Sequence, residues 1–192
     1  LAFSDNRQDA SLQAGHFNDF VLLGLVRSAL YRAAREQQER DRDEPLSDEN
    51  LGARVVAALG GDLTVFAKDP DSAHEPIPRR KISRALRDAV TYRLWADLKR
   101  GWRITMPNLE QTGQLQLDYF GIDELADDEE KWADAGQPLA AAEPQTRRML
   151  MQVLLDELRR NLCIETEFLT EEKYDSIKRA SQDWLKAPWA LS

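Results

Sequence analysis

The sequence predicts a mainly α-helical domain that carries one β-hairpin and begins with a short strand. Three observations lead to this fold class. Long stretches hold few helix breakers and repeat apolar residues every three or four positions, which is the period of a helix. Alternation of apolar and polar residues, which is typical of strands, appears only between Trp102 and Tyr119. The chain opens with three apolar residues, Leu1 to Phe3, and a polar turn follows them at once.

Three helices are expected in the N-terminal half. A long one covers about Gln8 to Gln38, where good helix formers dominate the second part. The next follows Ser47, a suitable N-cap, and ends at Gly60-Gly61. The proline-containing stretch 62–78 is expected to be an exposed loop, and a third helix should run from Arg79 to Lys99. The apolar residues of that third helix stand four apart: Ile82, Leu86, Val90, Leu94 and Leu98.

The hairpin is predicted from the stretch WRITMPNLEQTGQLQLDYFG, which begins at Trp102 and contains Pro-Asn and Thr-Gly turn signals. A helix pair followed by a hairpin is the order of a winged helix, in which a helix before the hairpin often faces DNA. Unrelated helical domains also carry a hairpin, so the sequence leaves both architectures open.

The C-terminal third is expected to be helical again. A short acidic helix is predicted near Asp123 to Ala135, a second begins at Pro144, and the last begins at Thr170. We therefore expect three segments. Residues 1–40 hold the strand, turn and long helix; residues 47–122 form the helical and hairpin segment; residues 123–192 form a helical segment that packs on the first helix.

Composition limits the class of protein. The 192 residues are 42% hydrophobic, which suffices for a core, and the longest apolar run, Phe20 to Val26, is too short to span a membrane. With Cys163 as its single cysteine and only His16 and His74 beside it, the chain has no internal disulfide framework and no support for a zinc site. We expect a soluble, cytoplasmic protein that uses no metal of its own.

The charge is spread unevenly along the chain. The net charge is -8, so the whole molecule has no bulk attraction for nucleic acid. Five basic residues nevertheless crowd the start of the third predicted helix: Arg79, Arg80, Lys81, Arg84 and Arg87. Such residues can bind phosphates without reading sequence, and Trp95, Trp102 and Arg103 follow nearby. The alternative is a solvated basic face beside two core tryptophans.

No complete catalytic constellation is visible. The chain has no glycine-rich phosphate loop, no Gly-x-Ser-x-Gly elbow and no His-Glu-x-x-His pair. Cys163 is better explained as a small buried residue than as a nucleophile. Catalytic residues are therefore predicted to be absent.

The opening segment LAFSDNRQDA carries a resemblance. An apolar strand ending in Phe3, then polar residues, Arg7 and a helix with Ala10 resembles motif IV of the DEAD/DEAH-box helicases of superfamily 2, which is the first strand of their second RecA-like domain. The longer strings FSDNRQDASLQAGHFNDF, YRLWADLKRGWRITMPNLEQTG and LKAPWAL are similar to one branch of large bacterial helicases with a helical insertion after motif IV. The resemblance covers almost the whole chain.

This resemblance implies a role by position. Ser4, Asn6 and Arg7 would lie at the carboxyl edge of a RecA-like strand and touch a nucleic-acid backbone or position the second domain. The alternative is a structural turn in which Asp5 and Asn6 cap the helix. The phosphate-binding loop, the DEAD/DEAH box and the arginine-finger motif are missing from this sequence, so the resemblance implies ATP and Mg²⁺ for a parent helicase and no cofactor for this chain.

We therefore expect an accessory insertion domain of an ATP-dependent nucleic-acid helicase, which contributes nucleic-acid contact or guidance rather than ATP hydrolysis. The expected partners are DNA, with RNA not excluded, and the remaining RecA-like domains, with no membrane. The alternative is a helical protein–protein interaction module that uses exposed aromatic residues such as Trp184 and Trp189 and binds no nucleic acid. The expected nucleic-acid-binding residues are Ser4, Asn6, Arg7, Arg79, Arg80, Lys81, Arg84, Arg87, Trp102 and Arg103.

Overall fold

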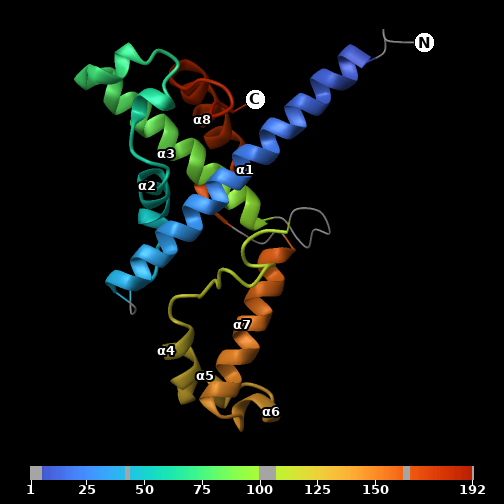
Figure 1. The fold of residues 1–192 in the computed structure, drawn as a ribbon. Coiled ribbons are helices and arrows are strands. Elements are labelled where there is room, and N and C mark those ends of the chain that lie inside the picture. Colours follow the sequence, from blue (N-terminus) through green and yellow to red (C-terminus); the bar gives the residue numbers. More distant parts are fainter. Residues whose placement is uncertain (1–5, 42–43, 100–106, 162–164, 192) are drawn as a thin grey trace. The chain divides into compact units, whose positions relative to one another are not determined.

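The structure, a computed structural model, describes residues 6–41, 44–99, 107–161 and 165–191, with side chains from residue 18 onward except that of Lys99. Figure 1 shows its α-helices, which differ in length and are joined by turns and loops. They are α1 (Asn6–Arg40), α2 (Asp48–Ala58), α3 (Pro76–Lys99), α4 (Ile122–Asp127), α5 (Glu129–Ala133), α6 (Gln137–Ala140), α7 (Pro144–Arg160) and α8 (Glu171–Trp184). Three 3-10 turns, η1 (Leu63–Val65), η2 (Asp71–His74) and η3 (Glu167–Leu169), complete the set.

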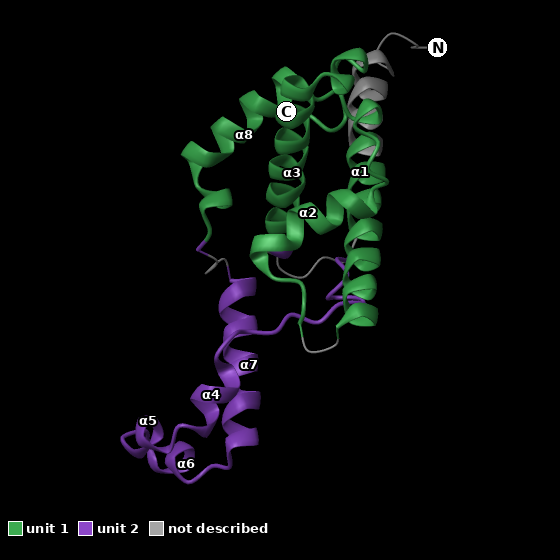
Figure 2. Ribbon diagram, turned by 90° about the vertical axis from the view of Figure 1, so that its left-hand side faces the viewer, with its two compact units in different colours: residues 1–97, 166–192 green, residues 98–165 purple. Residues whose placement is uncertain are grey.

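The chain divides into two compact units, which are coloured separately in Figure 2. Unit 1 contains residues 1–97 and 166–192, and therefore α1, α2, α8 and all of α3 except its last two residues. Unit 2 contains residues 98–165, and therefore α4 to α7.

The centre of unit 1 is α3. Its five apolar residues predicted at four-residue spacing are all buried, with Ile82, Leu86 and Val90 completely enclosed. Leu22 and Val26 are among the residues that α1 adds to the core of the unit. At the edge of this core, Arg27 of α1 donates through Nε and Nη2 to both carboxylate oxygens of Asp97 of α3, at 2.9 and 2.8 Å. The long helix and the third helix are therefore confirmed.

The stretch predicted as an exposed loop, residues 62–78, is partly buried instead. It forms η1 and η2, and α3 already begins at Pro76. Phe66 is only 3% exposed because its ring meets the ring of Trp189 edge to face at 4.8 Å between centroids. Backbone bonds add to this contact: Lys68 N donates to Trp184 O, and Lys186 N donates to Phe66 O. The sequence could not reveal this packing because the partner lies more than a hundred residues away.

The C-terminal tail is held by a largely buried arginine of α3. Arg93 donates to the carbonyl oxygens of Trp189 at 2.9 Å and of Pro188 and Ala190 at 3.2 Å. Burial lowers the pKa of Arg93 to about 10, which leaves the side chain charged at neutral pH. The guanidinium thus satisfies backbone acceptors that follow the end of α8.

The predicted fold class is wrong in its β-hairpin and its N-terminal strand. Across residues 6–41, 44–99, 107–161 and 165–191 no strand is formed, and the single β-bridge joins Ala67 to Leu185. The predicted RecA-like strand, Leu1 to Phe3, lies outside the described residues, and α1 starts at Asn6 with no sheet in the described part for a strand to join. A winged-helix arrangement is excluded with the hairpin.

The alternation that suggested the hairpin has another physical cause. Leu115, Leu117 and Tyr119 are half-buried while the residues between them are exposed. This segment runs extended along α7 instead of pairing with a second strand: Gln152 Nε2 donates to Leu117 O at 3.0 Å, and the Tyr119 hydroxyl donates to Asp156 at 2.8 Å. An extended chain with one covered side alternates between apolar and polar residues. This holds for a covering helix as well as for a covering sheet.

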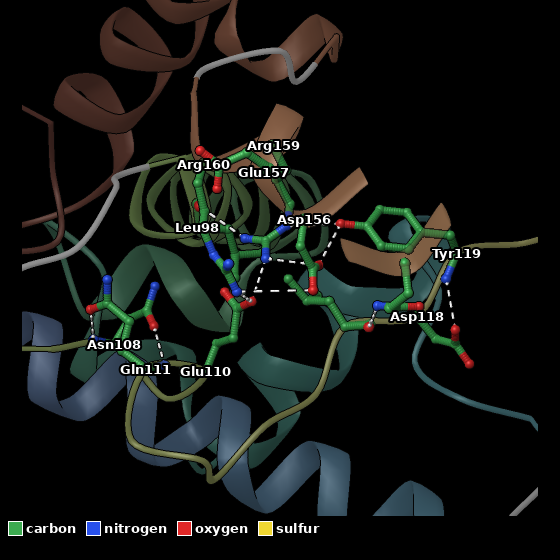
Figure 3. Close-up of polar contacts among 12 residues, drawn as sticks. Leu98, Asn108, Glu110, Gln111, Asp118, Tyr119, Asp156, Glu157, Arg159 and Arg160 are labelled. Carbon is green, nitrogen blue, oxygen red and sulfur yellow. Dashed lines mark hydrogen bonds and ion pairs between the residues drawn. The ribbon is translucent and has the colours of Figure 1, made fainter. Parts of the chain in front are cut away.

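A polar cluster fixes the same segment to α7, as Figure 3 shows. Arg159, with a side chain only 8% exposed, donates to Glu110, to the Tyr119 hydroxyl, to Asp156 and to the carbonyl oxygen of Leu98. Burial raises the pKa of Tyr119, so the hydroxyl keeps its proton and can donate to Asp156. Unit 2 therefore uses charge pairs where the sequence suggested strand pairing.

The other end of α7 is covered by α4, α5 and α6. Ile122 and Ala126 of α4 are buried, and the side chain of Arg147 from α7 is 1% exposed. Its guanidinium donates to the carbonyl oxygens of Ala126, Leu139 and Ala140. The guanidinium also donates to the carboxylate of Glu129 in α5, so one arginine joins α4, α5 and α6, which are too short to be stable helices alone.

Candidate nucleic-acid interface

The N-terminal half of α3 displays basic side chains on the surface of unit 1. All five predicted basic residues lie on this helix and are exposed: Arg79, Arg80, Lys81, Arg84 and Arg87. The helix is anchored by the buried side of the same turns, since Ile82, Ala85 and Leu86 are at most 2% exposed. A helix that is fixed by its buried side therefore presents the five cations at the surface.

Three of the five form one line along the helix. Arg80, Arg84 and Arg87 stand at positions i, i+4 and i+7, which share a face of an α-helix. They cover about 10 Å along the axis, given a rise of 1.5 Å per residue. We call these three residues the arginine ridge. Guanidinium groups in such a row can each bind phosphate oxygens through paired donors.

One carboxylate lies within the ridge. Asp88 approaches Arg84 at 3.7 Å and Arg87 at 3.6 Å, and the two arginine side chains are 77% and 51% exposed. Ion pairs this long and this exposed contribute little, because water screens them. Asp88 therefore leaves the ridge with an excess of positive charge.

The other two basic residues make contacts inside unit 1. Arg79 Nη1 donates to the carbonyl oxygen of Ala73 in η2 at 3.5 Å. Lys81 Nζ lies 5.0 Å from the centre of the Trp184 ring of α8, which is a cation–π distance. Sequence reasoning found all five cations but could not separate these two from the ridge. The segment that holds Ala73 was predicted to be an exposed loop, and Trp184 lies more than a hundred residues from Lys81.

The remaining predicted contact residues do not extend this site. Asn6 and Arg7 are the first two residues of α1, and nothing further is described of their side chains. Ser4, Trp102 and Arg103 lie outside the described residues. The arginine ridge is therefore the part of the predicted site that can be built from described side chains.

The aromatic side chains offer little additional surface for stacking. Trp95 is half-buried in α3. Trp184 is half-exposed, but Lys81 lies over its ring. Trp189 is 7% exposed against Phe66 and is not the exposed aromatic residue that the alternative prediction required.

A second surface was missed by the sequence reasoning. The helix predicted from Pro144 is present as α7, and five of its apolar residues are exposed. They are Met149, Leu150, Val153, Leu154 and Leu158. The sequence holds no clear signal for them, because nothing in it shows that Arg147 and Arg159 are buried on the side of α7 that the segments of unit 2 cover.

In the part of the chain that the structure describes, no group of three or more His, Cys, Asp and Glu side chains is arranged to hold a metal ion. None of the helices there combines the length and the apolar character that crossing a membrane requires.

Comparison with known proteins adds no relative. No protein-family model, no curated protein and no solved structure matches this chain.

Proposed function

We propose that this chain is an accessory helical domain of a cytoplasmic ATP-dependent nucleic-acid helicase, in which it contacts the nucleic-acid backbone and does not hydrolyse ATP. The helicase assignment rests on the resemblance of the segment around Phe3, Arg7 and Ala10 to motif IV and on the longer strings that accompany it. ATP and Mg²⁺ would bind to the parent's RecA-like domains.

The observation that supports nucleic-acid contact most directly is the arginine ridge. Three exposed guanidiniums follow one another along a rigid helix, and a single carboxylate, that of Asp88, lies among them. Such a row binds phosphates of successive nucleotides without distinguishing bases. The expected ligand is therefore a DNA or RNA backbone, with single strands preferred because a flexible strand adapts to a short convex helix.

The alternative function, a protein–protein interaction module that works through Trp184 and Trp189, has lost part of its basis. Trp189 is buried and the Trp184 ring is occupied by Lys81. The ridge can bind nucleic acid while another part of the chain binds a protein. Each role therefore needs its own test.

The test of the proposed function is a fluorescence anisotropy titration of the 192-residue chain with a labelled single-stranded oligonucleotide and its duplex. The triple variant R80A/R84A/R87A should bind the single strand at least about tenfold more weakly, since each phosphate contact adds to a charge-driven affinity. The control R32A/R35A/R40A removes the same charge from exposed positions of α1 and should retain binding. Equal binding by the wild type and the ridge variant would contradict the proposal.

A further inference from the structure

The second surface is the apolar stripe of α7, defined as Met149, Leu150, Val153, Leu154 and Leu158. Their exposed fractions run from 43% for Leu158 to 67% for Val153. The stripe extends over about 14 Å of helix, given the rise per residue. Five neighbouring large apolar side chains on one helix face are more than the scattered exposure that any soluble protein shows.

The stripe is not needed for the core of unit 2. The segments of that unit cover the other side of α7, where Arg147 binds three carbonyl oxygens and Gln152 donates to Leu117 O. Asp156 and Arg159 hold Tyr119 from the same side. The helix is thus positioned by polar contacts on one side while its apolar residues face away from them.

The charge within the stripe limits what can cover it. Glu157 lies among the apolar residues, because it stands four positions after Val153 and three after Leu154 and so neighbours both on the helix surface. Its carboxylate accepts a hydrogen bond from Asn161 Nδ2 at 2.8 Å, and no ion pair of Glu157 occurs among the residues that the structure describes. Any occupant that buries this carboxylate must supply a cation, because an unpaired buried charge is costly.

A second copy of the chain does not meet this condition. Two antiparallel α7 helices centred between Val153 and Leu154 would place Glu157 opposite Leu150 of the other copy, with no cation there. Unit 2 holds 13 acidic and 8 basic residues between positions 98 and 165, a net charge of -5, so two units also repel each other. Charge complementarity therefore favours a basic partner.

We propose that the apolar stripe of α7 is a docking surface for an amphipathic helix of another protein, whose apolar side recurs every three or four residues and whose flank carries Lys or Arg opposite Glu157. Helix-on-helix docking of this kind uses anchors three or four residues apart, and Leu150, Leu154 and Leu158 of the stripe have a spacing of four. The cation supplies partner preference, while the apolar anchors supply most of the affinity.

Two designed peptides test the proposal. Both are helices of about 18 residues with leucines at the same positions, one flanked by lysines and the other by glutamates. Labelled peptides are titrated with the full chain and followed by fluorescence anisotropy. We expect the lysine peptide to bind and the glutamate peptide to bind at least about tenfold more weakly, equivalent to one ion pair of about 1.4 kcal/mol.

Three variants separate docking on α7 from general attraction of a basic peptide to an acidic protein. V153S/L154S should weaken binding of the lysine peptide at least about tenfold. V65S, which alters another exposed apolar residue in η1, should leave this binding unchanged. Glu157→Lys should reverse the preference between the two peptides. Circular dichroism checks that each variant keeps its helix content.

The opposite results would overturn the proposal. They are failure of the lysine peptide to bind, an unchanged preference in the Glu157→Lys variant, or equal losses in V153S/L154S and V65S. Sedimentation velocity tests for a further contradicting outcome. If the wild-type chain is a dimer and V153S/L154S is a monomer, the stripe binds a second copy of the chain instead.

Discussion

Arg147 shows how a charged side chain can organise a small unit. Its side chain is 1% exposed, yet its donors meet three backbone carbonyls and both carboxylate oxygens of Glu129, at 2.9 and 3.0 Å. The guanidinium also lies 5.4 Å from the ring centre of Trp132. Buried charges are tolerated when all their donors are satisfied, which is the case here.

We predict that Arg147→Met destabilises the protein by about 3 kcal/mol or more, because three carbonyl acceptors lose their donor inside the unit. The measurement is urea unfolding followed by circular dichroism. The matched control is Arg148→Met at the next position, where the side chain is 34% exposed and pairs with Asp118 and Asp123. That change should cost under about 1 kcal/mol. Equal losses in the two variants would refute this role of Arg147.

Glu129 makes the same cluster sensitive to acid. The hydrogen bond from Arg147 lowers the pKa of Glu129 below its ordinary value of 4.5. A lowered pKa in the folded state means that the carboxylate stabilises the fold above pH 4.5, and that this contribution is lost as the pH falls through the folded-state pKa.

The corresponding prediction compares thermal unfolding of the wild type and Glu129→Gln between pH 7 and pH 3. The wild type should have the higher midpoint at pH 7, and the gap should close as the pH falls below 4.5, because protonation removes the charge that the variant already lacks. A gap that stays constant down to pH 3 would show that the charge of Glu129 is irrelevant.

At the scale of elements, α2 and α3 approach each other at a glycine. A Cβ atom added at Gly52 would lie 2.0 Å from Thr91 Oγ1 and 3.1 Å from Arg87 Cγ. Gly52 is buried, and so is Thr91, whose hydroxyl donates to the carbonyl oxygen of Arg87 at 2.8 Å. The close approach of the two helices therefore depends on the missing side chain.

Gly52→Ala should destabilise the protein by about 1 to 3 kcal/mol, since the added methyl group forces the helices or Thr91 to shift. Gly24→Ala in α1 is the control: no atom lies within 4 Å of its added Cβ, so the higher helix propensity of alanine should stabilise by up to about 1 kcal/mol. Urea unfolding measures both. Adding Thr91→Ala should recover part of the Gly52→Ala loss, and no recovery would argue against the contact.

Local pattern predicted the helices and failed where contacts are distant in sequence. The spacing of Ile82, Leu86 and Val90 located α3, and Thr170 was recognised as the start of α8, where its side chain accepts from Lys173 N. The segment through Leu117 alternates because α7 covers one side of it, and sequence alone cannot tell a covering helix from a neighbouring strand. Ser47 precedes α2 as expected, although its side chain makes no capping bond.

The apolar residues of α7 illustrate a second limit. Leucines at four-residue spacing predict a stripe but not which side of the helix is covered. In α7 the covered side is the one with Arg147 and Arg159, because their long side chains reach backbone and carboxylate acceptors. The proposed partner helix would cover Leu150, Leu154 and their neighbours.

For the whole molecule, the distribution of charge matters more than its sum. A net charge of -8 disfavours bulk attraction for nucleic acid, so any binding must come from a local arrangement of cations. The sequence located the five cations of α3, but only the structure separates the exposed ridge of Arg80, Arg84 and Arg87 from Arg79 and Lys81, which serve contacts within unit 1.

The salt dependence of single-strand binding tests the central claim most directly. Each phosphate contact contributes about -0.7 to the slope of the logarithm of the binding constant against the logarithm of the salt concentration. If the ridge makes three such contacts, R80A/R84A/R87A should flatten the slope by about 2. The α1 control R32A/R35A/R40A should leave the slope near that of the wild type. A ridge variant with the slope of the wild type, or with no more change than the control, would contradict the proposal that the arginine ridge binds the nucleic-acid backbone.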